Sequence, residues 1–349
     1  MNIKIEYTKK SSPKIVSDMR FGSTFTDKMF EMNYDKDNGW TNPVLKNYEP
    51  FVISPATLVL HYGQEIFEGQ KAYKWKDGRI VVFRPEMNIK RFNNSAKQMC
   101  MPAVDEELFM QALESLVWAD RDWIPQGDGQ SLYIRAAMIA TDPVLGVRAG
   151  TQYKFFIINS PSGCYFPEGF NPMRIWVSDT HTRTVAGGIG EAKTGGNYAA
   201  SLRAGQRAHK EGFSAVLFLD AKEKKYIDEA GPANFFAIKG SKYITPNSSS
   251  ILPSITNMSL REIAKDLGLE VELRSIGADE LGNFDEVGAC GTAAVISPIK
   301  KILDRETGIE YNYCKDGKAG PVSTKLYEKL RGIQLGDEPD KFGWNLVIE

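Results

Sequence analysis

The stretch GGIGEAKTGGNY, residues 187–198, places a single lysine, Lys193, among glycines and directly before a threonine. This spacing lies one residue from the phosphate-loop pattern G-x-x-x-x-G-K-[ST], because Ala192 stands where the pattern has its second glycine. A phosphate-loop lysine begins a continuous helix, whereas each of the two glycines after Thr194 would cost about 1 kcal/mol inside one. We therefore expect Lys193 on an irregular loop, with a helix only from about Tyr198. The pattern alone leaves three roles open: a surface lysine, a phosphate ligand or a covalent lysine.

The composition restricts the possible partners of the chain. Its 349 residues are enough for two domains, and 43 basic against 44 acidic residues give a net charge of −1. This balance removes the electrostatic argument for a nucleic-acid or anionic-membrane partner. No apolar run approaches the length of a membrane span, and the N-terminal residues lack the apolar core of a signal peptide.

The cysteines and histidines indicate a compartment and exclude one kind of site. Four widely spaced cysteines form no CxxC pair, which favours a reducing cytoplasm over a disulfide framework. The three histidines form no HExxH motif and no cluster with cysteine, so we expect no metal site.

The order of the segments indicates a mixed α/β (α+β) protein of two domains. We expect a small N-terminal α/β domain over residues 1–160, a Ser-, Pro- and Gly-rich linker over 161–172, and a larger C-terminal domain over 173–349. Residues 56–75 look like strands around turns, whereas 105–124 have a helical apolar face. Other expected elements are a helix over 198–212 ended by its glycine, a hairpin from 214 to 238, and a helix over 254–268 capped by Ser254 or Thr256.

A nucleotide hydrolase competes with the covalent reading of Lys193. AVLFLD, residues 215–220, has the pattern of a buried strand that ends in an acid, Asp220, as a magnesium-binding strand would. A hydrolase would, however, need a glycine at position 192 and a helix directly after Lys193. A covalent lysine that uses pyridoxal phosphate has different requirements: a carboxylate for the pyridine nitrogen, basic and backbone donors for the phosphate, and a donor for the phenolic oxygen.

Several blocks of the sequence occur in the order found in one known family. They include HYGQEIFEGQKAY, RFNNSAKQM, LYIR, KTGGNYAASL, YIDEAGPANFF, ILPSIT and GTAAVISP, and they extend over nearly the whole chain. With these blocks the chain resembles the branched-chain amino acid aminotransferases, which are class IV, fold-type IV pyridoxal-phosphate enzymes. The resemblance implies an active site between the two domains. It also implies reversible transamination of leucine, isoleucine and valine with 2-oxoglutarate, so that the partners are small amino acids and 2-oxo acids.

The resemblance implies a role for each of the cofactor-binding residues. Lys193 would form the Schiff base with pyridoxal 5′-phosphate and carry the proton, because a desolvated lysine amine is both nucleophilic and basic. Each of the other residues, taken alone, would be an ordinary core or surface residue. The implied assignments are Glu229 for the pyridine nitrogen, Tyr198 for the phenolic oxygen, Arg91, Ile255, Thr256 and Thr292 for the phosphate, and Arg183 near the cofactor.

The resemblance also implies a substrate pocket and a homodimer. Leu145 and Val147, in the loop 142–150, would reach the substrate of the partner subunit, although the loop could instead fold back on its own domain. The remaining implied assignments are Tyr62 and the Thr292–Ala293 backbone for the α-carboxylate, Arg135 for the distal carboxylate, and Phe21, Phe67 and Tyr133 for the apolar walls.

Some positions depart from the family pattern. Pro232 replaces a polar residue near the expected pyridine carboxylate, and Ser254 replaces a glycine at the expected phosphate site. Ala294 and Ser297 stand where some relatives carry a redox-active thiol pair, so we expect no such switch. Within the same fold, D-amino acid aminotransferase and aminodeoxychorismate lyase are the alternatives. A non-catalytic binding protein is a third reading, against which the intact set of expected cofactor residues argues.

Overall fold

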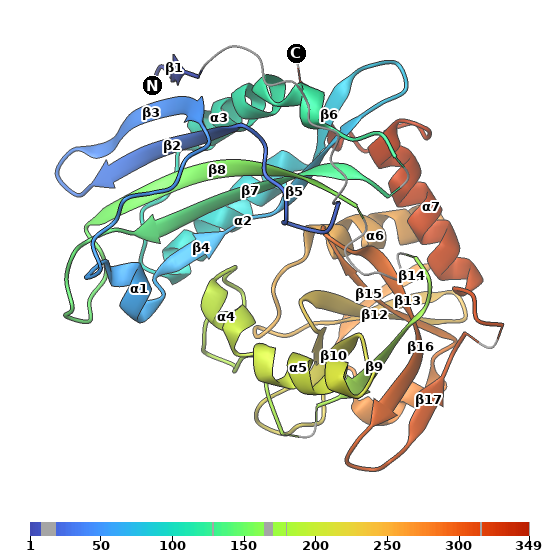
Figure 1. Cartoon of the computed structure of the whole chain (residues 1–349). Coiled ribbons are helices and arrows are strands. Elements are labelled where there is room, and N and C mark those ends of the chain that lie inside the picture. Colours follow the sequence, from blue (N-terminus) through green and yellow to red (C-terminus); the bar gives the residue numbers. More distant parts are fainter. Residues whose placement is uncertain (8–18, 128, 164–169, 179, 315, 349) are drawn as a thin grey trace. The chain divides into compact units, whose positions relative to one another are not determined.

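The computed structural model describes residues 1–7, 19–127, 129–163, 170–178, 180–314 and 316–348 (Figure 1). The chain forms two compact units, each with its own sheet and core. Unit 1 comprises Met1–Tyr165, Ala192–Gly195 and Gln334–Glu349, and unit 2 comprises Phe166–Glu191 and Gly196–Ile333. The expected linker over 161–172 includes residues 164–169, which lie outside the described part of the chain.

Unit 1 is built on a mixed sheet whose strand order is β1-β3-β2-β8-β7-β5-β6-β18, with β4 pairing with β7. The central strands β7 and β8 pair antiparallel over ten residues of each strand, from Ser131↔Ser162 to Ala140↔Tyr153. The strands of this sheet are β1 (Lys4–Glu6), β2 (Lys28–Asp35), β3 (Gly39–Asn47), β4 (Glu65–Phe67), β5 (Gln70–Lys74), β6 (Ile80–Phe83), β7 (Ser131–Ala140), β8 (Gln152–Ser162) and β18 (Asn345–Ile348).

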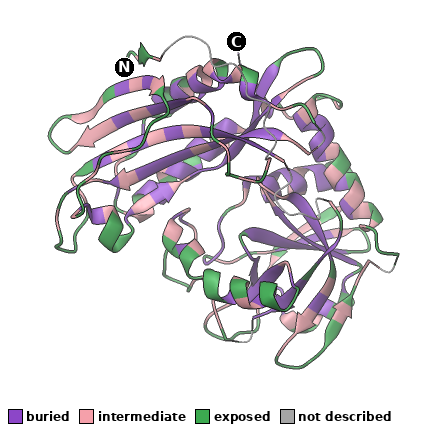
Figure 2. Ribbon diagram, viewed as in Figure 1, coloured by how far each residue is buried: buried purple, intermediate pink, exposed green. Residues whose placement is uncertain are grey.

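Two helices, α2 (Pro85–Gln98) and α3 (Glu106–Ala119), pack together and onto this sheet. Asp105 caps α3 by accepting a hydrogen bond from the backbone N–H of Leu108. The apolar face predicted for α3, which includes Leu113 and Leu116, is buried in the core of unit 1. In Figure 2 the strands are mostly buried, whereas the helices carry exposed as well as buried residues.

The segment 56–75 contains a helix that the sequence analysis did not predict. Residues Leu58–Tyr62 form the short helix α1, whereas we expected strand there. The backbone N–H of Leu58 donates to the carbonyl oxygen of Asp142, and Gly63 ends the helix in the left-handed conformation, with φ of 60°. The strand prediction was therefore wrong at this point, because a contact with a residue 84 positions away decides the local structure.

Two segments from later in the chain belong to unit 1, although the sequence division placed all of 173–349 in the C-terminal domain. One is Ala192–Gly195, which contains Lys193, and the other is Gln334–Glu349. In the second segment, β18 pairs antiparallel with β6, and the Trp344 ring packs edge-on against Phe83. Addition of β18 covers the edge of β6, whose apolar residues would otherwise present unpaired backbone groups.

Unit 2 is built on a second sheet, ordered β11-β10-β9-β16-β15-β12-β13-β14, with β17 pairing with β16. Because β11 also pairs with β12, part of the sheet closes on itself. Its strands are β9 (Met173–Val177), β10 (Ala215–Leu219), β11 (Ile227–Ala230), β12 (Ala233–Lys239), β13 (Lys242–Pro246), β14 (Glu270–Arg274), β15 (Glu286–Gly291), β16 (Val295–Asp304) and β17 (Glu310–Asn312). The further helices are α4 (Gly195–Ala199), α5 (Leu202–Lys210), α6 (Ile255–Asp266) and α7 (Pro321–Leu335), and 3-10 turns occur at Arg121–Trp123 and Ala278–Asn283.

The local signals in unit 2 are partly as the sequence predicts. The helix expected over 198–212 is instead two helices, α4 and α5, separated by a turn at residues 200–201. The antiparallel pair β10–β11 forms the expected hairpin. Ser254 caps α6 by accepting a hydrogen bond from the N–H of Asn257 at 3.2 Å, which confirms one of the two caps considered. Helix α5 packs on β10, and α6 packs on β14 and β15.

Candidate active site

Lys193 lies on irregular backbone, as predicted, and a short helix follows it. The backbone N–H of Phe67 donates to the Lys193 carbonyl oxygen at 2.9 Å, and the Lys193 N–H donates to Ser95 Oγ at 2.9 Å. The helix α4 begins at Gly195, so the expectation that no helix would start before Tyr198 was wrong.

The carboxylate of Glu65 explains why a helix begins on glycine. It accepts hydrogen bonds from the backbone N–H of Gly195 and from the hydroxyl of Thr194. A negative charge at a helix start offsets the poor helix propensity of glycine. A Cβ atom on Gly195 would lie 2.5 Å from the Glu65 oxygen, so the approach also requires a residue without a side chain.

The side chain of Lys193 is partly buried, among groups of both signs of charge. Its Nζ lies 4.7 Å from the centroid of the Phe67 ring. Burial, followed by the positive charge of Arg91, lowers the pKa of Lys193 to about 8; Glu68 acts in the opposite direction. The neutral amine that a nucleophile or proton acceptor requires is therefore more accessible near pH 7 than in an ordinary lysine.

Arg91 is buried, and its guanidinium pairs with an acid that we had not selected from the sequence. Its Nε donates to Glu68 Oε1 at 2.6 Å, and its Nη2 donates to Glu68 Oε2 at 2.9 Å. Asn88 Nδ2 donates to the same carboxylate at 2.7 Å. The charge of the guanidinium lowers the pKa of Glu68 against the effect of burial, so this acid is ionised.

Four of the expected substrate residues come together around one aromatic wall in unit 1. The rings of Phe21 and Tyr133 pack edge to face, with their centroids 4.6 Å apart. The Arg135 guanidinium lies 4.5 Å from the centroid of Phe67, and its Nη2 donates to Tyr133 Oη at 3.3 Å. Lys193 shares the Phe67 ring with this group, so the wall lies beside the amine.

The loop expected to reach a partner subunit is exposed in the single chain. The accessible fraction is 62% for Leu145 and 81% for Val147, and Tyr62 Oη donates to the Leu145 carbonyl oxygen. Asp142 organises the loop, because its carboxylate accepts hydrogen bonds from Arg148 and from the residues that follow the loop. These bonds lower the pKa of Asp142 to about 2, although burial acts in the opposite direction.

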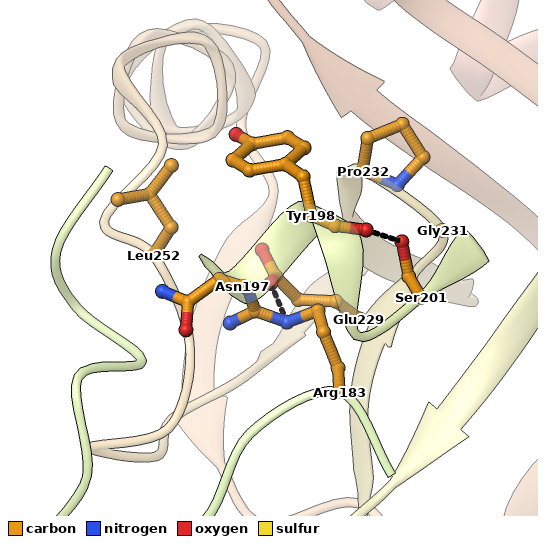
Figure 3. A pocket seen from close by; sticks show the side chains of 8 residues that line it. All are labelled: Arg183, Asn197, Tyr198, Ser201, Glu229, Gly231, Pro232 and Leu252. Carbon is orange, nitrogen blue, oxygen red and sulfur yellow. Dashed lines mark hydrogen bonds and ion pairs between the residues drawn. The ribbon is translucent and has the colours of Figure 1, made fainter. Parts of the chain in front are cut away.

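Unit 2 contains a narrow pocket at which three of the expected cofactor residues meet (Figure 3). Glu229, from β11, is almost completely buried and forms an ion pair with Arg183, with 2.5 Å between Oε2 and Nε. Tyr198, from α4, lines the same pocket. The other lining residues are Asn197, Ser201, Gly231, Pro232 and Leu252.

Asn234 is a residue of this pocket region that the sequence analysis missed. Its Nδ2 donates to Glu229 Oε1 at 2.7 Å and to the carbonyl oxygen of Leu252 at 3.0 Å. Its Oδ1 accepts a hydrogen bond from Asn257 Nδ2 of α6 at 3.1 Å. Asn234 therefore supplies a hydrogen bond to the carboxylate, where Pro232 has none to offer. A single amide inside the apolar strand ANFFAI was the available signal, since buried polar groups need partners.

The start of α6 has the features of an anion site. Among the described residues, no acceptor is assigned to the backbone N–H groups of Ile255 and Thr256. The departure from glycine at Ser254 causes no backbone strain, since its φ is −78°. Thr292 and Ala293 lie in the turn between β15 and β16.

The features that favoured a nucleotide hydrolase have ordinary structural roles. The carboxylate of Asp220 accepts hydrogen bonds from the backbone N–H groups of Glu223, Lys225 and Tyr226, so it closes a turn. Helix α4 ends at Ala199 and is far shorter than a phosphate-loop helix. Within the described residues, no three His, Cys, Asp or Glu side chains gather as metal ligands would.

The expected residues thus form two groups. Lys193, Arg91, Phe21, Phe67, Tyr133 and Arg135 gather in unit 1, and Arg183, Tyr198 and Glu229 gather in unit 2. The chain passes from unit 1 to unit 2 between Gly195 and Gly196.

The comparison with known families identifies the class. Residues 65–302 match the family model described as amino-transferase class IV. A half-buried lysine with a lowered pKa and a buried carboxylate paired with arginine agree with this match. The chain is an aminotransferase of class IV, with the two-unit mixed α/β fold of the fold-type IV enzymes.

Relatives narrow the assignment. A probable branched-chain-amino-acid aminotransferase of Staphylococcus aureus (strain N315) is 48% identical, with 98% of this chain and 96% of the relative covered. Branched-chain-amino-acid aminotransferase 2 of Bacillus subtilis is 44% identical, with 99% and 97% covered. The crystal structure of the Escherichia coli branched-chain amino acid aminotransferase has a TM-score of 0.77 at 28% identity, with 92% of this chain and 99% of that chain covered. The chain therefore belongs to the branched-chain amino acid aminotransferase family.

Proposed function

We propose that this protein reversibly transfers the amino group of leucine, isoleucine or valine to 2-oxoglutarate, with pyridoxal 5′-phosphate held on Lys193. The names of the relatives support the substrate class. A similar solved structure, of another branched-chain amino acid aminotransferase, is described with pyridoxamine 5′-phosphate; its TM-score is 0.76 and it is 28% identical over 92% of this chain. The observation that carries the proposal is the position of the Lys193 amine against the Phe67 ring, which it shares with the Arg135 guanidinium.

The described residues offer complementary groups for each part of this cofactor. Glu229 is a buried, arginine-paired carboxylate suited to a protonated pyridine nitrogen. The orphan N–H groups at the start of α6 suit phosphate oxygens, as helix starts commonly do. We assign Arg91 and Thr292 to the phosphate as well, Tyr198 to the phenolic oxygen, and Arg183 to the support of Glu229.

The cofactor and the residues of the chain would contribute different parts of the chemistry. Bound pyridoxal phosphate would supply an electron sink for the carbanion formed at the substrate Cα. Lys193 Nζ would accept the proton from that Cα, and its lowered pKa suits this role near neutral pH. Glu229, paired with Arg183 and oriented by a hydrogen bond from Asn234, would favour a positive charge on the ring nitrogen.

The substrate pocket must accept an apolar side chain and then a carboxylate. The rings of Phe21, Phe67 and Tyr133 provide an apolar surface for leucine. Arg135 lies against that surface, and its Nε has no partner among the described residues, so it can serve the distal carboxylate of glutamate. Tyr62 and the Thr292–Ala293 backbone are assigned to the α-carboxylate.

We also propose a cytoplasmic homodimer in which the loop 142–150 closes the pocket of the partner. Leu145 and Val147 are exposed in the single chain, and a monomer gains nothing from exposing both. Cytoplasmic location stays a prediction from the four widely spaced cysteines. None of the helices in the described ranges has the length and apolar character needed to cross a bilayer.

Two experiments test the proposal. The purified protein should form glutamate from leucine and 2-oxoglutarate, with a visible spectrum that changes when leucine is added; Lys193→Ala is the inactive control. Activity with D-alanine, or release of 4-aminobenzoate from aminodeoxychorismate, in place of leucine activity would favour one of the two same-fold alternatives. For the dimer, Val147→Asp subunits are mixed with Lys193→Ala subunits. Recovered activity supports a loop that serves the partner site, whereas no recovery after proven subunit exchange contradicts it.

A further inference from the structure

Beside Lys193 lies a buried acid that none of the roles above uses. Glu68 is completely buried, between β4 and β5. All its described hydrogen bonds come from donors: two from Arg91, one from Asn88 Nδ2, and one from the backbone N–H of Gly69 at 3.0 Å. An ionised carboxylate with this many donors in a dry site is stable only while its cation stays in place.

The Glu68–Arg91 pair joins the same two elements that hold the Lys193 backbone. Phe67, which precedes Glu68, donates its N–H to the Lys193 carbonyl oxygen. On the other side, Ser95 Oγ accepts the Lys193 N–H and donates to the Arg91 carbonyl oxygen at 3.0 Å. Lys193 is therefore attached to the end of β4 and to α2, and the ion pair connects these two elements directly.

The charged and titratable groups facing the Lys193 amine come from three elements. Arg91 lies on α2, Glu68 follows β4, and Tyr133 and Arg135 lie on β7. Burial and the two arginines favour the neutral amine and lower the pKa of Lys193, whereas Glu68 and Tyr133 oppose them. Arg91 and Lys193 carry like charges close together, and Glu68, which is buried beside Arg91, supplies the opposite charge that makes them compatible.

We propose that Glu68 is a positioning residue for Lys193, because it fixes the Arg91 guanidinium and balances its charge where the lysine must take up and release a proton. The inference deepens the proposed function and rests on it for the catalytic role of Lys193. The charge coupling itself is a property of the chain and can be measured without turnover.

The test measures the titration of Lys193 in the full-length, cofactor-free protein. Competitive acetylation at a series of pH values, followed by peptide mass spectrometry, gives the midpoint for this lysine. Glu68→Gln should lower the midpoint by about one pKa unit, Arg91→Met should raise it, and the double variant should return it close to that of the unchanged protein. Glu65→Gln is the matched control: it removes a carboxylate of β4 that hydrogen-bonds to Thr194 and Gly195 and not to Arg91, while its amide oxygen can still accept the Gly195 N–H.

A second measurement uses the cofactor-loaded protein. The pH midpoint of its visible spectrum should move in the same direction in Glu68→Gln as the labelling midpoint. An unchanged Lys193 midpoint in a folded Glu68→Gln variant overturns the inference. If that variant does not fold, the comparison of Arg91→Met with the double variant replaces it, and removal of Glu68 must then still lower the midpoint.

The outcome is separable from that of the proposed function. A shifted midpoint in a protein that does not transaminate leucine would retain the charge coupling and reject the function. Normal leucine turnover with no shift would retain the function and reject the role of Glu68.

Discussion

Gly69 lies where the backbone packs against Tyr133, one of the aromatic residues of the proposed substrate pocket. Gly69→Ala should therefore disturb this pocket and leave the proposed cofactor-binding residues unchanged. A Cβ atom at position 69 would lie 1.8 Å from Tyr133 Oη and 2.6 Å from its Cζ. The hydroxyl must retreat by about 1.6 Å to reach the 3.4 Å of an ordinary contact. The ring would then leave its edge contact with Phe21, and the hydroxyl would lose the bond from Arg135.

The expected free-energy cost of Gly69→Ala follows from overpacking, since the added methyl group has no space beside Tyr133. An inserted methyl in a packed site costs about 1–3 kcal/mol, and 1.4 kcal/mol is a factor of ten. If the strain is relieved by movement of the ring, kcat/KM for leucine should fall by roughly 5- to 150-fold, with the cofactor still bound. If the Tyr133 ring keeps its position, the strain destabilises the folded protein and the Tm falls. The assay is therefore leucine-dependent glutamate formation together with thermal unfolding.

Two backgrounds isolate the contact with Tyr133. In Tyr133→Phe the hydroxyl is gone but the Cζ position, 2.6 Å from the new methyl, is unchanged, so Gly69→Ala should remain costly. In Tyr133→Leu the ring is gone, and the added methyl should have a small effect. Wild-type kcat/KM and Tm in Gly69→Ala, or an equal loss in both backgrounds, would refute the reasoning.

Borohydride treatment of the cofactor-loaded protein should leave a pyridoxyl mass on Lys193 in peptide mass spectrometry; the same mass on another lysine would contradict the assignment. Glu229→Gln should still bind the cofactor but slow proton abstraction strongly in single-turnover kinetics, because the charge opposite the ring nitrogen is lost. The folded-state pKa of Asp142 is about 2, below its ordinary 3.8, so its stabilising contribution is present above about pH 4 and is lost as the pH falls towards 2. Asp142→Asn should flatten the acid side of an unfolding profile and raise KM for leucine; an unaltered acid limb would show that the carboxylate does not stabilise the fold. Mild peroxide should leave activity largely unchanged, since Ser297 replaces one thiol and burial raises the pKa of Cys290 well above its ordinary value; dithiothreitol-reversible inactivation would contradict this.

Sequence reasoning was most successful where the cause is local. The Ser254 cap and the buried face of α3 follow from a short hydroxyl side chain and from helical spacing. The resemblance, which rests on blocks along the whole chain, added the family, and the full-length relatives confirm it.

What the sequence by itself determined was therefore the family and the fold class; that Lys193 is the reactive lysine stays a prediction from the resemblance. Only the tertiary structure decided where α4 begins, because Glu65, 130 residues away in sequence, accepts the Gly195 N–H. The same is true of β18, whose pairing with β6 brings the end of the chain into unit 1, and of Glu68, whose charge has meaning only beside Arg91. Such contacts join residues that are distant in sequence, and a buried charge or an exposed strand edge gains its energy from the partner that folding brings to it.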